Sequence, residues 1–174
     1  VHNANFGSRL VEGSYSLRPR KQGDIRGAPF WRELAAQGRR LLIMDVPFCR
    51  VDPNYRGLQL AGWGGHEWSA RRESWPTGLL AEIDREFGPY PIAQTIDDAW
   101  EKGGAGELIG GLLEGIERRT KIIERLSGTH DWEFLYTVFH EAHSAGHCLW
   151  HLGDPHHPRF SAEESAAHGN GLLR

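Results

Sequence analysis

The chain has 174 residues and a formal charge of −3, because 20 Lys and Arg stand against 23 Asp and Glu. Hydrophobic residues make up 39% and charged residues 25% of the sequence, which is typical of a folded globular domain and excludes disorder or a coiled coil as the main state. No apolar run approaches the ~20 residues of a membrane-spanning helix, so we expect no membrane partner. The mildly acidic balance argues against nucleic acid as a partner, since nucleic-acid binding needs a basic face.

The length fits a single domain covering residues 1–174. The chain opens at Val1 without an initiator Met and stops at Arg174 just after an apolar pattern begins, so we expect an internal segment of a larger domain. Cys49 and Cys148 form neither a CxxC motif nor a disulfide framework, which favours a reducing compartment and a cytoplasmic location. The sequence gives no indication of the oligomeric state.

The first predicted elements alternate between helix and strand. A short strand is expected near residues 14–17, and a helix over residues 29–37. Pro29 suits the first turn of that helix, and Gly38 suits the position just past its end. Residues 40–46 contain a continuous apolar run, which is typical of a strand buried on both faces of a parallel sheet. This order predicts an α/β domain.

The rest of the chain continues the alternation after a long connection. Residues 47–76 are predicted to be an irregular loop, because aromatic and turn residues alternate there without a clear period. Thr77 is expected to cap a helix over residues 78–87. A longer helix is predicted over residues 107–126, with its charged face in solvent, and a second strand over residues 132–139.

Eight of the ten histidines lie between positions 130 and 168, just beyond the end of that second strand. The zinc-protease pattern HExxH fails there, because His140 and Glu141 are followed by Ser144 at the position where the pattern needs His. His143 and His147 are four residues apart, so on a helix their imidazoles lie on one face and can converge on one cation. His151 is expected to continue the same stripe.

Two histidines are fewer than the three or four ligands that zinc generally takes, so other interpretations remain open. One is a stripe of solvated histidines without a function. Glu141 and Asp154 are candidates for ligands or, preferably, for partners that orient an imidazole. Another alternative is a non-catalytic, His-rich module that binds zinc or nickel for a structural or storage role, with four candidate ligands: His140, His143, His147 and His151.

The stretch over residues 131–151 resembles the alkaline phosphatase superfamily, and within it the type I phosphodiesterase/nucleotide pyrophosphatase branch. In that branch a strand leads into an Asp-x-x-x-His turn that holds one of two active-site metals. By match to this motif His147 takes the His role and His143 takes the Asp position, an exchange that removes one negative charge. Residues 30–47 and 62–68 also resemble segments of that family.

The resemblance implies a partial, alkaline-phosphatase-like three-layer α/β/α domain with a mostly parallel sheet. It further implies a metal-dependent phosphoester hydrolase with two divalent ions, zinc being the expected metal, and a small phosphoester as substrate. His143 and His147 are the implied metal ligands, and His66 is a weaker candidate for lining the substrate cleft. The family's nucleophile and remaining ligands have no counterpart in this chain, so we expect no catalytic residue in it and no activity from it alone. A sulfatase-like hydrolase and an inactive remnant are the alternatives.

Overall fold

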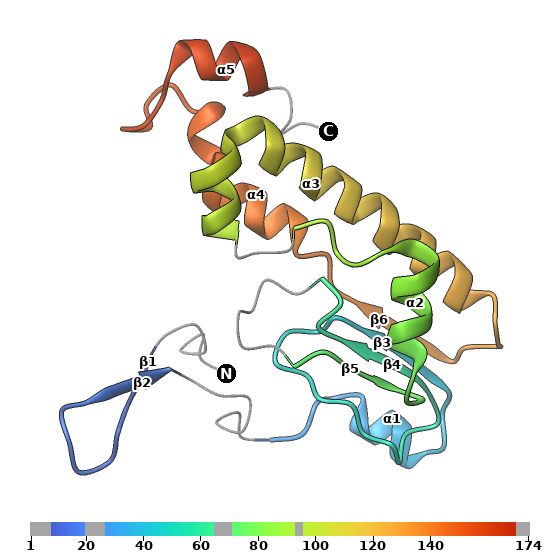
Figure 1. The fold of residues 1–174 in the computed structure, drawn as a ribbon. Helices are drawn as coiled ribbons and strands as arrows, with labels where there is room; N and C mark the ends of the chain where they lie inside the picture. The colour runs from blue at the N-terminus through green and yellow to red at the C-terminus, as the bar shows by residue number, and fades with distance from the viewer. Residues whose placement is uncertain (1–7, 20–26, 65–70, 93–95, 170–174) are drawn as a thin grey trace.

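The computed structural model describes residues 8–19, 27–64, 71–92 and 96–169 (Figure 1). Its centre is a four-stranded sheet in the order β5-β4-β3-β6, in which β3 pairs in parallel with both β4 and β6, and β5 pairs antiparallel with β4. The predicted α/β fold with a mostly parallel sheet is confirmed at this level. The sheet strands are β3 (Leu41–Met44), β4 (Gly57–Ala61), β5 (Glu73–Trp75) and β6 (Phe134–Thr137).

Helices at the expected places alternate with the strands of the sheet, as the structure's element order shows. A separate hairpin is formed by β1 (Ser8–Leu10) and β2 (Leu17–Pro19). The helices are α1 (Arg32–Ala36), α2 (Leu79–Phe87), α3 (Ile96–Ser127), α4 (Glu141–Leu149), the short 3-10 helix η3 (Trp150–Leu152) and α5 (Ala162–His168). The chain breaks the regularity of α3 at Gly104, where φ is 68° and ψ is −170°.

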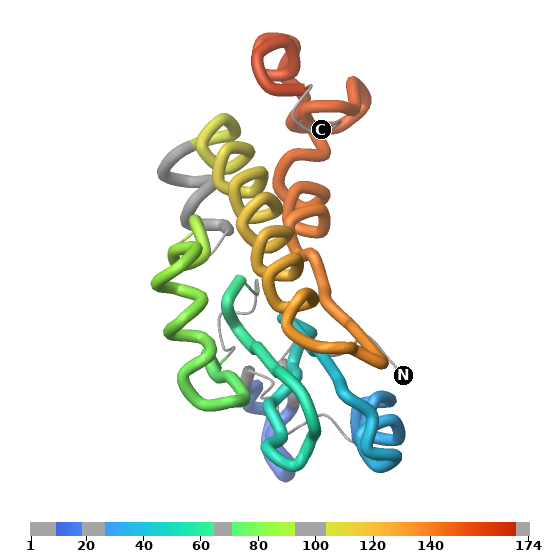
Figure 2. The backbone as a smooth tube through the Cα atoms, turned by 90° about the vertical axis from the view of Figure 1, so that its right-hand side faces the viewer, coloured from blue at the N-terminus to red at the C-terminus, as the bar shows by residue number. Residues whose placement is uncertain are grey.

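The central strand β3 is buried on both faces and separates two apolar layers. Because side chains alternate along a strand, Leu42 and Met44 face one way while Leu41 and Ile43 face the other. The first pair packs against α2 and α3, and the second pair packs against Trp31 beside α1. Figures 1 and 2 show α1 on one side of the sheet and α2 with α3 on the other.

Helix α4 lies beside α3, beyond the end of the sheet (Figure 2). Its apolar residues join a cluster with the first half of α3, separate from the layers on the sheet. That cluster consists of Ala105, Leu108, Leu112, Leu149 and Leu152. The chain therefore leaves β6 at the end of the sheet and continues directly into a helix that α3 supports. Over the described part of the chain, no helix has the length and apolar character needed to cross a bilayer.

Three local expectations are wrong. Residues 14–16 form the turn of the β1–β2 hairpin and not a strand. The loop predicted over residues 47–76 contains β4 and β5, which pair with each other. Gly78, with φ of 99°, stands at the N-terminus of α2 where Thr77 was expected to cap it, and the backbone N–H of Leu80 donates instead to Ser74 Oγ at 3.0 Å.

Strand β4 can pair with β3 only because its first residue lacks a side chain. Gly57 has φ of 135°, and a Cβ atom there would lie 1.9 Å from the carbonyl oxygen of Leu41.

We therefore expect Gly57→Ala to lower the free energy of unfolding by about 2 kcal/mol or more, measured by urea denaturation. Gly110→Ala is the matched control, because no atom lies within 4 Å of its Cβ position in α3. It should raise stability by about 0.5–1 kcal/mol. Equal stability of the Gly57→Ala variant and the wild type would contradict this strand pairing.

Candidate metal centre

The histidine pair lies on the exposed side of α4, the helix that follows the parallel strand β6. The side chains of His143 and His147 are exposed, their ring centroids are 4.5 Å apart, and the two ring planes meet at 82°. The helical period brings the rings to one side of α4, as the spacing predicts. Both rings are therefore accessible from solvent and next to each other, which a shared cation requires.

At this place the described residues bring two imidazoles together. Within the described ranges, no group of three or more His, Cys, Asp or Glu side chains is arranged to hold a metal ion. A complete zinc site needs one or two more ligands. The pair alone has fewer ligands than such a site needs, and metal binding by it stays a prediction.

Two of the four histidines in the His-rich module are turned away from this pair. His151 was expected to continue the stripe, but the chain tightens into η3 at Trp150, and His151 is buried at 3% exposure. Its ring lies 5.8 Å from that of His157, and its Nε2 lies 4.0 Å from Glu164. His140 is also buried, with Nε2 donating to the backbone carbonyl of Asp45 at 2.8 Å.

The other expected site residues have different surroundings. Glu141 does not orient an imidazole, because its carboxylate is buried and accepts hydrogen bonds from Arg119. Asp154 accepts a hydrogen bond from the backbone N–H of His156, which closes a turn. His66, the weaker candidate for the substrate cleft, lies outside the described residues.

Beneath the start of α4 lies a buried network of charges that the sequence analysis missed. The guanidinium of Arg119 donates from Nη1 to Asp45 Oδ2 at 2.6 Å and from Nη2 to Glu141 Oε1 at 3.1 Å. Nη2 also donates to the carbonyl oxygen of Gly64 at 3.0 Å. All three charged side chains have 0% exposure. One cation thus joins α3 to the ends of β3 and β4 and to α4.

Asp45 takes an unusual backbone conformation to enter this network. It follows the last residue of β3 with φ of 50°, in the left-handed region that costs a non-glycine residue about 1–3 kcal/mol. Its carboxylate accepts from the backbone N–H groups of Trp63 and Gly64, both at 2.9 Å, as well as from Arg119. These bonds offset the backbone strain and tie β3 to the chain that leaves β4.

Aromatic rings surround the guanidinium and keep water from it. The Arg119 Cζ atom lies 5.4 Å from the ring centroid of Trp63, 6.0 Å from that of Tyr90 and 5.6 Å from that of Phe139. Burial alone lowers the pKa of Arg119, but the charges of Asp45 and Glu141 outweigh it and raise that pKa. Arg119 therefore carries its charge at every relevant pH. Burial, followed by the charge of Glu141, raises the pKa of the Tyr90 hydroxyl.

A signal for Arg119 was present in the sequence. Arg119 continues the spacing of the buried side of α3, since it lies three residues before Ile122 and seven after Leu112, both of which are buried. A charge at an apolar helix position indicates a buried partner or a functional group. The neighbouring charged residues of α3 are solvated, as expected, and their presence made Arg119 look like one more residue of the solvated face.

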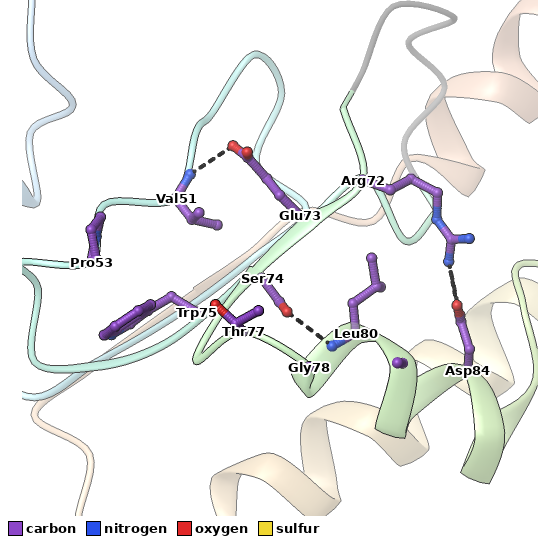
Figure 3. Close-up of a pocket in the computed structure, with 11 residues that line it drawn as sticks. Val51, Pro53, Arg72, Glu73, Ser74, Trp75, Thr77, Gly78, Leu80 and Asp84 are labelled. Atoms are coloured by element: carbon purple, nitrogen blue, oxygen red, sulfur yellow. Dashed lines mark hydrogen bonds and ion pairs between the residues drawn. The ribbon is translucent and has the colours of Figure 1, made fainter.

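A separate pocket of about 570 Å³ lies at the β5 edge of the sheet, between β5, the start of α2 and the loop after β3 (Figure 3). Its charged side chains take part in hydrogen bonds. Arg72 donates to both carboxylate oxygens of Asp84 at 2.8 Å, and Glu73 accepts from the backbone N–H of Val51 at 3.1 Å. Neither His143 nor His147 lines this pocket.

Comparison of the chain with protein families, with curated proteins and with solved structures finds no match. The functional assignment therefore depends on the residues and their geometry.

His140 offers a titration that reports on the junction between β3 and α4. Burial lowers the pKa of His140 below the ordinary 6.5, its bond to the Asp45 carbonyl opposes that effect, and the Arg119 charge adds to it. An NMR titration should therefore give a midpoint below 6.5. As the pH falls from 6.5 towards that midpoint, His140 becomes protonated in the unfolded chain while it stays neutral in the native chain. The contribution of neutral His140 to the free energy of unfolding is therefore lost in that pH range. A midpoint at or above 6.5 would mean that His140 is hydrated.

Proposed function

We propose that this chain is part of a metal-dependent phosphoester hydrolase, of the phosphodiesterase or phosphatase type, and that His143 and His147 hold one of its divalent ions. The observation that carries the proposal is the exposed imidazole pair on the helix that follows a parallel strand. Ligands of open α/β sheets bind outside the C-terminal ends of the strands. The pair lies beyond such an end.

The resemblance to the alkaline phosphatase superfamily adds the reaction type. The resembling stretch, residues 131–151, covers β6 and α4, so its strand-then-turn order coincides with a real strand and helix. A mixed α/β fold with a mostly parallel sheet is compatible with an alkaline-phosphatase-like domain. The buried Asp45 also lies in a resembling segment, residues 30–47, at the same end of the sheet.

The donors suit zinc better than magnesium. Two neutral imidazoles are nitrogen ligands of borderline softness, which zinc accepts and which hard cations such as magnesium disfavour. A zinc ion bound at this pair would polarise a phosphoryl oxygen of the ester as a Lewis acid. The role of the chain is to hold that ion at the surface of α4, with its remaining ligands and the nucleophile supplied from outside the described residues. The substrate that fits this chemistry is a small phosphate mono- or diester.

Zinc titration by calorimetry tests the ligand assignment. We expect the chain to bind one zinc ion, and His143→Ala and His147→Ala each to weaken binding by more than about tenfold, because a single imidazole cannot chelate. His156→Ala is the matched control, since this exposed histidine lies in a turn away from α4 and should leave the affinity unchanged. Binding that survives the double His143→Ala, His147→Ala substitution would contradict the assignment.

Hydrolysis of p-nitrophenyl phosphate and its diester by the protein in its intact reading frame tests the reaction. We expect zinc-dependent turnover that the double substitution abolishes and His156→Ala preserves. Zinc binding without any turnover would instead support the non-catalytic metal-binding module. Preference for p-nitrophenyl sulfate would support the sulfatase alternative.

A further inference from the structure

We propose that Arg119 is a positioning residue, which holds the first turn of α4 against the sheet and thereby places His143 and His147 beyond the C-terminal ends of β3 and β4. The consequence for metal binding rests on the proposed function. The mechanical part, the tether between α3, the sheet and α4, rests only on contacts within the described residues.

The tether consists of hydrogen bonds on two sides of one guanidinium. On one side Nη1 binds Asp45 at the end of β3. On the other, Nε and Nη2 both bind Glu141 Oε1, at 3.2 and 3.1 Å. Glu141 is the first residue of α4, and His140 directly before it binds the Asp45 carbonyl. The start of α4 is therefore attached to β3 twice, once through a backbone acceptor and once through Arg119.

The balance of charge makes the attachment to Glu141 depend on Arg119. The network contains one cation and two carboxylates, all buried. The Asp45 carboxylate has two backbone N–H donors in addition, from Trp63 and Gly64. Glu141 instead receives its charged hydrogen bonds from the guanidinium. Moving α4 away from α3 would leave a buried carboxylate without its cation, which is strongly unfavourable.

The tether determines where the histidine pair lies, while the helix determines how the two rings lie relative to each other. His143 follows Glu141 by two residues, so it belongs to the tethered turn, and His147 lies on the next turn. The pair needs ligands from other elements. The coordination shell of an ion can therefore be completed only if α4 keeps a fixed position. Groups that orient a ligand typically change metal affinity by about 10–100-fold.

Glu141→Ala tests the tether without leaving an unbalanced charge, because Arg119 and Asp45 remain as a neutral pair. We expect amide exchange over residues 144–149, whose N–H groups are hydrogen-bonded within α4, to accelerate by about tenfold or more, with exchange in β3 unchanged, and zinc affinity to fall by about tenfold. Glu141→Gln keeps an acceptor oxygen for Arg119 and should restore both values to near wild type. Glu163→Ala, at an exposed position of α5, is the control and should change neither.

The two readouts separate the tether from the proposed function. Unchanged amide exchange in Glu141→Ala would overturn the positioning role, and so would an equal loss of protection in β3, which would make Glu141 a general core residue. Faster exchange confined to α4 supports the tether even if the wild-type chain binds no zinc, and in that case it is the proposed function that fails. Faster exchange with unchanged zinc affinity would overturn the link between the tether and the metal.

Discussion

A single buried guanidinium connects the parts of this fold that the proposed site needs. Arg119 brings its charge into a layer of aromatic rings, where it is stable only because Asp45 and Glu141 face it. Removing one member of such a buried set typically costs about 3–5 kcal/mol, because the remaining charge is left without a partner. The ends of β3 and β4, the long helix α3 and the start of α4 therefore have to stay together.

This constraint gives the exposed histidine pair a defined place. On an isolated helix, two imidazoles four residues apart would form a weak and mobile chelate. Here α4 packs along α3 and is attached at its first turn, so His143 and His147 are presented from a supported surface at the end of the sheet. Rigid support is what a partial metal site needs if ligands from elsewhere are to complete it. This placement and the sequence resemblance are the support for the proposed phosphoester chemistry.

The sequence predicted the elements whose signals are local. The apolar run before Asp45 and the helical period of α3 identify β3 and α3, and the four-residue spacing correctly puts the two imidazoles on one side of a helix. Strand β4 was missed because it begins with Gly57 and contains Gln59, and both interrupt the apolar pattern of a buried strand. The buried side-chain amide of Gln59 is hydrogen-bonded to the backbone of Asp52.

The charge network could not be assembled from spacing alone. Its members are separated by up to 96 positions, and they meet only when the parallel pairing of β3 with β4 and β6 is in place. His151 shows the same limit on a smaller scale. The sequence spacing of His151 continues the row of His143 and His147. A change from α-helical to 3-10 geometry after Leu149 nevertheless directs its side chain into the protein interior.

A crystal structure of the zinc-soaked chain, with anomalous differences measured at the zinc absorption edge, tests the central claim most directly. The account predicts one strong peak at about 2.0–2.1 Å from a ring nitrogen of both His143 and His147, with Glu141 still bound to Arg119. A peak at another group of residues, or rings of His143 and His147 that stay without metal at saturating zinc, would contradict it.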